Sequence, residues 1–191
     1  MAENKVQFGL KNVHYAKLTT TYSSGVYSYA WGTPVRINGG VNLSLQEKGG
    51  ISTFYADNIA YFRAIASNGY SGELEIAHIP DSMYTDIWGE TLHGTDKTLL
   101  EKDNDTTSSF ALLFQIDGDQ NDNLYVLYNC DASKPNIASG TKTDSAEPKT
   151  QTLSIDASPL QTGICMCHTT ANTTTTVRNG WFTSVYTQPV S

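Results

Sequence analysis

The chain has little of several features that mark whole classes of protein. Its 191 residues contain three cysteines, an odd and sparse number that argues against a disulfide framework. No run approaches the roughly 18 apolar residues of a membrane-spanning helix. The start, MAENKVQFGLKN, lacks the apolar segment of a signal peptide. We therefore expect reduced thiols, no membrane association and no secretion signal.

Clustered positive charge is also missing. The chain carries 12 Lys and Arg against 19 Asp and Glu, a formal net charge of −7, and it has no basic stripe. Without such a stripe, we do not expect the chain to bind nucleic acid through its phosphates. Residues 73–122 hold twelve acidic side chains and two lysines, a net charge of −10, so the remainder sums to +3. The simplest interpretation of this excess is a solvated acidic face.

Catalytic signatures are absent too. The histidines at 14, 78, 93 and 168 lie in no hydrolase or zinc motif, and no glycine-rich phosphate loop occurs. Glu73 and Glu75 share one face of an alternating segment, a spacing that could serve glycoside hydrolysis. Solvent-facing alternation explains them more simply. The sequence therefore predicts no enzyme and no cofactor.

Two short stretches invite a metal interpretation. DGDQNDN (117–123) fails as a calcium loop, because counting from Asp117 or from Asp119 puts no glycine at position 6 and no carboxylate at position 12. Its flanks, SFALLFQI and LYVLYNC, are apolar, so a hairpin turn is predicted. CMCH (165–168) has no second ligand pair elsewhere. We predict no metal site.

What is present favours strands. Tyrosine and threonine are abundant, and 41–47, 72–79 and 149–157 alternate between apolar and polar residues. The runs 109–116 and 124–130 are apolar on both faces, which predicts central strands covered on both sides. We expect one mainly β domain over 1–191, a β-sandwich or barrel.

Other segments fill in this outline. One flanking helix is predicted over 80–89, capped by Asp81 and stopped by Gly89. Residues 1–20 read as an extended N-terminal arm. Residues 51–72 read as a long inter-strand loop or a long hairpin, with more apolar surface than a monomer's loop needs. Residues 21–40 are loop-like, 169–176 form a polar tip, and 180–187 close the chain as a strand.

Taken together, these segments resemble a known family, the major tail proteins, or tail tube proteins, of long-tailed siphophages that infect Gram-positive bacteria. The similar stretches run nearly end to end, and only TTANTTTT (169–176) departs locally. They are NKVQFGLKNVHYAKLT, GTPVRINGGVNLSLQ, TFYADNIAYF, NGYSGELEIAHIPDSM, LLFQIDGDQ, VLYNC, KTDSAEPKTQTLSIDASP and NGWFTSVY.

The resemblance implies a structural virion protein with a tail-tube fold, made in the host cytoplasm. Such proteins form hexameric rings that stack into a tube, with strands of six subunits closing a barrel around a DNA channel. The implied partners are further copies of the chain, the tape-measure protein, the tail terminator and the distal tail or initiator proteins. Phage DNA would pass through the lumen without specific binding. We expect no additional immunoglobulin-like domain.

The residues suggest where such contacts would lie. Exposed apolar and polar groups of the arm and of 51–72 would be buried only by a partner, unless they form a local core of their own. The predicted subunit contacts are Trp31, Phe54, Tyr55, Asp57, Asn58, Tyr61 and Phe62. The predicted lumen residues, on whichever polar sheet face points inward, are Glu73, Glu75, Thr150, Thr152 and Asp156.

Two other functions remain open at this level. A monomeric β-sandwich that binds carbohydrate could use the exposed tyrosines and tryptophans. A glycosidase-like enzyme using Glu73 and Glu75 is the weaker alternative.

Overall fold

The protein is mainly β, as the sequence predicts. The computed structural model describes residues 9–56, 58–117, 122–137 and 149–188, without the side chains of 51–56, 60 and 63–66. Its described strands are β1 (Leu10–Ser23), β2 (Val26–Trp31), β3 (Val35–Arg36), β4 (Gly40–Ala56), β5 (Ile59–Ile76), β6 (Thr91–Leu92), β7 (Leu99–Leu100), β8 (Phe110–Ile116), β9 (Leu124–Ala132), β10 (Gln151–Ala157) and β11 (Met166–His168). The helices are α1 (Asp81–Asp86) and α2 (Thr175–Gly180).

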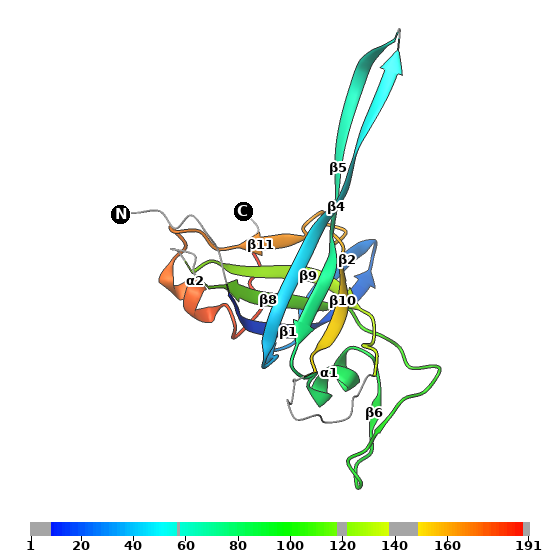
Figure 1. The fold of residues 1–191 in the computed structure, drawn as a ribbon, viewed down its shortest axis with the longest axis vertical. Helices are drawn as coiled ribbons and strands as arrows, with labels where there is room; N and C mark the ends of the chain where they lie inside the picture. The colour runs from blue at the N-terminus through cyan, green and yellow to red at the C-terminus, as the bar shows by residue number, and fades with distance from the viewer. Residues whose placement is uncertain (1–8, 57, 118–121, 138–148, 189–191) are drawn as a thin grey trace, which may run out of the picture.

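One large antiparallel sheet contains nearly all of these strands. Its described order is β2-β1-β8-β9-β10-β5-β4, with β11 added beside β9 and β3 beside β1, whereas β6 and β7 form a separate small hairpin. The sheet folds back on itself, so that β4 and β5 cross over β8 and β9 (Figure 1). This folding creates the two-layered arrangement that the sequence predicts as a sandwich or barrel.

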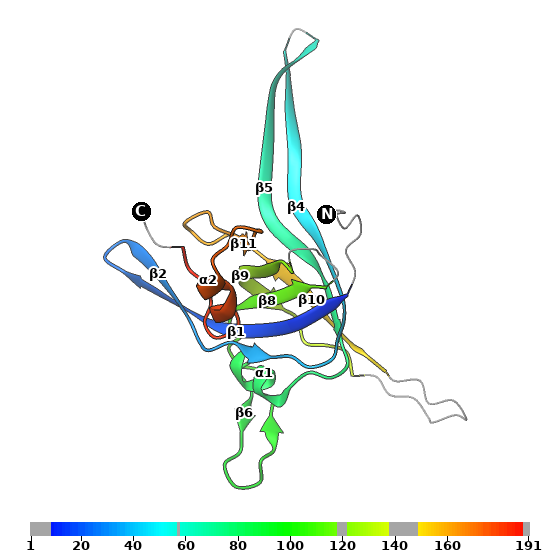
Figure 2. The same ribbon diagram turned by 90° about the vertical axis from the view of Figure 1, so that its left-hand side faces the viewer.

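The larger core lies between the two layers of the folded sheet. Leu74 and Ile76 of β5 and Leu153 of β10 meet Phe110 and Leu112 of β8 there. Helix α1 packs onto one end and adds Met83 together with the residues that follow it, Ile87 and Trp88. Figure 2 shows α1 below β1, with the β6–β7 hairpin hanging beneath it.

A second, smaller core covers the other face of β8 and β9. Ala111 and Leu113 of β8 and Val126 of β9 pack there against Trp181, which follows α2. Every β8 residue from Phe110 to Gln115 is buried. The prediction of a central strand covered on both faces is therefore confirmed.

The N-terminal arm predicted over 1–20 is wrong for residues 10–20. These residues belong to β1, which pairs with β8 on one side and with β2 on the other. Val13 and Tyr15 face the larger core, and Ala16 and Leu18 face the smaller one. Since both faces of this strand are covered, apolar and polar residues do not alternate cleanly along it. Its sequence therefore lacks the period of two that indicates a half-buried strand. Residues 1–8 lie outside the described residues.

Residues 51–72 form strands rather than a long loop. β4 and β5 pair from Gly40–Ile76 outward to Ala56–Ile59. Of the two predicted alternatives, a loop or a long hairpin, the chain therefore adopts the hairpin. The register shifts between Glu47 and Gly49, where the hairpin leaves the body. Gly69 lies opposite this bulge with φ +98°, and a Cβ there would sit 2.0 Å from the carbonyl oxygen of Ala157. Only glycine fits such an approach.

The helix predicted over 80–89 exists in shorter form. It spans Asp81–Asp86, its N-cap is Pro80, and Asp81 makes no capping hydrogen bond. Met83 and Ile87 are buried as predicted, and Gly89 has the left-handed φ of +73° that suits a helix stop.

The C-terminal predictions are partly wrong. Residues 181–187 form turns and irregular backbone instead of a strand, and Gly180 ends the short helix α2, into which the polar stretch before it leads. β2 and β3 also fall inside 21–40, which was predicted to be a loop. By contrast, Leu153, Ile155 and Ala157 line the buried face of β10, as their alternation predicts.

Candidate assembly surfaces

The distal half of the β4–β5 hairpin projects far from the body, and no other described segment lies beside it (Figures 1 and 2). Near its tip, Ile59, Tyr61 and Phe62 are 62%, 72% and 62% exposed. Asn58 adopts the left-handed conformation that a tight turn requires, with φ +62°. A two-stranded hairpin that exposes large apolar side chains on its own is marginally stable in water. This segment is therefore the strongest candidate for a surface that a partner covers.

The predicted contact residues fall into three groups. Asn58, Tyr61 and Phe62 are exposed on the distal hairpin. Phe54 and Tyr55 lie in β4 of the same hairpin, but their side chains and all of Asp57 lie outside the described residues. Trp31 lies elsewhere, half-buried at the end of β2, where its Nε1 donates a hydrogen bond of 2.9 Å to the carbonyl oxygen of Tyr128.

The predicted lumen residues gather on one face of the sheet. Thr152 of β10 pairs with Glu75 of β5, Ser154 pairs with Glu73, and Asp156 pairs with Ser71. The intervening residues of both strands are buried in the larger core. This polar face, which we call the acidic face, is completed by Asp131 of β9, the pairing partner of Asp156.

Polar contacts tie the acidic face together. Thr150 donates a hydrogen bond to the Glu75 carboxylate, and Lys48 of β4 forms an ion pair with Asp156. Ser109 donates to Asp131 at 2.7 Å. The face therefore carries four carboxylates, and the groups that it presents on its surface are mainly negative charges and hydroxyl groups.

A row of aromatic side chains on the β1–β2 hairpin was not singled out from the sequence as a unit. Tyr27, Tyr29 and Trp31 alternate along β2, and Tyr22 faces Tyr27 across the hairpin. Successive ring centroids lie 4.7, 6.5 and 6.4 Å apart from Tyr22 to Trp31. The period-2 pattern YSYAW (27–31) is the signal that could have revealed this aromatic row.

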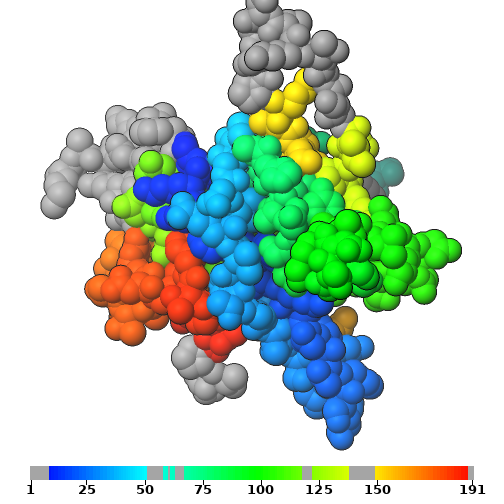
Figure 3. Space-filling model, turned by 90° about the horizontal axis from the view of Figure 1, so that it is seen from below, coloured from blue at the N-terminus to red at the C-terminus, as the bar shows by residue number. Residues whose placement is uncertain are grey.

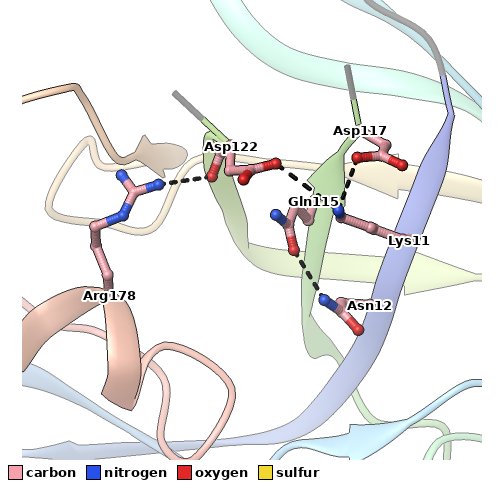
Figure 4. Close-up of polar contacts among 6 residues, drawn as sticks. All are labelled: Lys11, Asn12, Gln115, Asp117, Asp122 and Arg178. Carbon is pink, nitrogen blue, oxygen red and sulfur yellow. Dashed lines mark hydrogen bonds and ion pairs between the residues drawn. The ribbon is translucent and has the colours of Figure 1, made fainter. Parts of the chain in front are cut away.

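The DGDQNDN segment joins β8 to β9, which pair antiparallel, so the predicted hairpin connection is confirmed. Lys11 Nζ lies 2.7 Å from Asp117 Oδ1 and 3.7 Å from Asp122 Oδ1, at the two ends of the connection (Figure 4). The hydrogen bond with Asp117 raises the pKa of Lys11 above its ordinary value. Arg178 Nη2 donates 2.9 Å to the carbonyl oxygen of Asp122, which links α2 to the same turn. Residues 118–121 lie outside the described residues.

An apolar groove of about 470 Å³ opens at the foot of the hairpin. Its lining includes Leu43 and Leu45 of β4, Phe114 of β8 and Met166 of β11. The groove shows that the larger core is not closed at this end, so a second apolar surface remains available beside the exposed hairpin.

Titratable groups inside the body are held in uncharged forms. Burial raises the pKa of the Tyr15 hydroxyl and of the Cys130 thiol well above their ordinary values. Burial lowers the pKa of His14, and the nearby Arg36 adds to this effect. All three cysteines are free thiols. Tyr15, Cys130 and His14 are therefore uncharged at neutral pH.

Within the described residues, no group of three or more His, Cys, Asp or Glu side chains is placed to hold a metal ion. None of the helices in the described ranges is long and apolar enough to cross a membrane. Compared with known proteins, the chain matches no protein-family model and no curated protein.

Proposed function

We propose that the protein is a structural subunit that assembles with further copies of itself into stacked rings, forming the tube of a phage tail. The observation that carries this proposal is the distal β4–β5 hairpin, which exposes Ile59, Tyr61 and Phe62 far from the body. An apolar hairpin without a covering element is explained by a neighbouring subunit that packs against it.

The direction of the hairpin supports association into rings or tubes. The tip projects away from its own body, and the apolar groove lies at the foot of the same hairpin (Figure 1). When a projecting surface of one subunit meets a different surface of the next, the contact is heterologous. Heterologous contacts generate rings where the rotation closes, and filaments where it does not.

The acidic face supports the role of a conduit. Glu73, Glu75, Asp131 and Asp156 share one face of a sheet whose other face is the core. Carboxylates that line a channel repel phosphates, so DNA would slide past them without sticking. In this proposal the acidic face lines the lumen, and the tape-measure protein occupies the channel before the DNA does.

Negative-stain electron microscopy and sedimentation across a concentration series test the proposal directly. The purified protein is expected to form rings or tubes with a central hole, with the assembled fraction growing with concentration. The double variant Tyr61→Ser/Phe62→Ser should remain folded and lose assembly. Leu100→Ser, which removes an exposed leucine from the β6–β7 hairpin, is the matched control and should assemble normally.

Two results would contradict this function. The first is a particle that stays monomeric at every concentration. The second is a double variant that forms tubes as readily as the parent protein, because the hairpin would then not be the assembly element.

A further inference from the structure

We infer that the outer end of the aromatic row is a binding site for a neutral saccharide. The row is Tyr22, Tyr27, Tyr29 and Trp31 on the β1–β2 hairpin, and this inference does not depend on the proposed tube function. Figure 3 shows the β1–β2 hairpin, in blue, projecting from the body separately from the green β6–β7 region. Its tip is therefore open to a ligand on the described surface.

The row is anchored at its inner end and open at its outer end. Trp31 packs against Tyr128 with ring centroids 5.5 Å apart, and it donates its Nε1 hydrogen to the Tyr128 carbonyl oxygen. The Tyr29 hydroxyl accepts a hydrogen bond of 3.0 Å from the backbone N–H of Gln161. Beyond these fixed rings, Tyr27 and Tyr22 are 44% and 63% exposed. The exposed rings thus extend from a fixed base, which lowers the entropy lost when a ligand binds.

A small hollow of about 150 Å³ lies beside Tyr27 and Tyr29. Thr20, Asn129 and Gln161 line it together with Pro159 and Leu160. Within the described part of the chain, the side chains of Thr20, Asn129 and Gln161 make no hydrogen bond, so their hydroxyl and amide groups are available to a ligand. The hollow is smaller than the pockets that enclose drug-sized ligands, and it suits one ring-sized group.

The chemistry of the lining selects the ligand class. None of the residues that line the hollow carries a charge, which gives no advantage to phosphates, carboxylates or cations. A pyranose ring presents C–H groups on its faces, which pack on an aromatic ring, and hydroxyl groups on its edge, which bond to amides. An apolar protein surface would instead leave the amides of Asn129 and Gln161 without partners, which is unfavourable. The observations therefore favour a saccharide over a second copy of this chain.

Isothermal titration calorimetry with cellotetraose, maltotetraose and chitotetraose tests the inference on the full-length protein. At least one of these neutral oligosaccharides is expected to bind saturably, with a Kd of about 10 μM to 1 mM. Tyr27→Ala should weaken that binding about tenfold or more, and Tyr27→Phe should largely retain it, because stacking needs the ring and not the hydroxyl. Gln161→Ala should weaken binding while its backbone N–H still holds Tyr29.

Tyr61→Ala is the matched control, since it removes a tyrosine that is more exposed than Tyr27, at 72% against 44%, from the other hairpin, and it should bind the sugar as the parent does. Circular dichroism and sedimentation of Tyr27→Ala distinguish the loss of a sugar contact from misfolding of the variant.

Absence of binding to all three oligosaccharides overturns the inference. Binding that Tyr27→Ala and Gln161→Ala leave unchanged overturns it as well. If Tyr27→Ala abolishes assembly and no sugar binds, the row is a subunit contact instead. Tube formation by the parent protein is scored separately, so failure of this inference leaves the proposed function standing.

Discussion

Strand β8 and the distal β4–β5 hairpin are both apolar in sequence, yet they lie in opposite environments. β8 is covered on one face by the larger core and on the other by Trp181 and its neighbours. The distal hairpin has no described element against either face (Figure 1). The same residue types therefore stabilise the folded chain in one region and remain available for association in the other.

The difference lies in which elements reach each region. β8 sits between β1 and β9 in the middle of the sheet, so elements from both ends of the chain pack onto it. The distal hairpin lies beyond the bulge at Gly69, where the pairing of β5 with β10 has already ended at Tyr70. Substitutions in the two regions should consequently affect different properties of the protein.

The largest expected effect on folding comes from Leu112→Ala in β8. Leu112 is fully buried in the larger core, and truncation leaves a cavity, so the free energy of unfolding should fall by about 2–5 kcal/mol. Tyr61→Ala, on the exposed hairpin, should change it by no more than about 0.5 kcal/mol. Urea unfolding at a concentration where the chain is monomeric measures both. Equal losses in the two variants would remove the contrast between the regions.

A smaller effect is expected from Tyr15→Phe in β1. The Tyr15 hydroxyl lies 2.8 Å from Ser82 Oγ and 2.9 Å from Asp86 Oδ2, which ties the sheet to α1. Removing it leaves both partners short of a hydrogen bond and should lower the free energy of unfolding by about 1–2 kcal/mol. Tyr61→Phe is the same substitution on the hairpin and should have no measurable effect. Thermal unfolding of the two variants side by side would reveal any departure from this order.

The smallest expected effect is a pH dependence from His14. Its Nδ1 donates 2.8 Å to the carbonyl oxygen of Asn12, and its ring stacks on Phe182 with centroids 4.6 Å apart. Because burial lowers the pKa of His14 from 6.5, the unfolded chain binds the proton more readily than the folded chain. This contribution to stability is complete above pH 6.5 and is lost as the pH falls toward the folded-state pKa.

The slope from one such proton is at most about 1.4 kcal/mol per pH unit. His14→Gln should flatten the stability profile of the protein between pH 7.5 and pH 5.5. His78→Gln, at an exposed histidine, should leave that profile as steep as in the parent. Urea midpoints across this pH range provide the comparison, and a profile that His14→Gln does not alter would show that His14 is not the group responsible.

The sequence anticipated elements whose residues have one uniform environment along their length. β10 alternates between the core and the acidic face, and its period of two is visible in QTLSIDA. β8 is apolar on both faces, and its unbroken apolar run indicates as much. The sequence pattern did not reveal β1, because the two faces of this strand meet different cores. It did not reveal α2 either, because the threonine-rich sequence of this helix has low helix propensity. The residue after α2, Trp181, packs against β9.

For the acidic face and the aromatic row as well, the sequence predicts one part and the tertiary structure decides the other. Glu73 and Asp156 were each expected to face a polar side, but their strands are neighbours only because β10 pairs with β5. Tyr27 and Tyr29 alternate within one short strand, yet their relation to Asn129 and Gln161 depends on residues about a hundred positions away. The alternation of side chains within one strand can be predicted from the sequence. Which strands and loops lie beside it depends on pairing between distant segments.

By itself, then, the sequence determined the mainly β character, the central position of β8, the turn at DGDQNDN and the apolar chemistry of the hairpin around Tyr61. These follow from local periodicity and turn preference, which depend on residues close together in the chain. Only the tertiary structure decided that residues 10–20 form a core strand, that β4 and β5 continue past Gly69 as a projecting hairpin, and that Lys11 meets the turn beyond β8. Those outcomes depend on which distant strands pair, because burial is shared between segments and no local pattern encodes the partner.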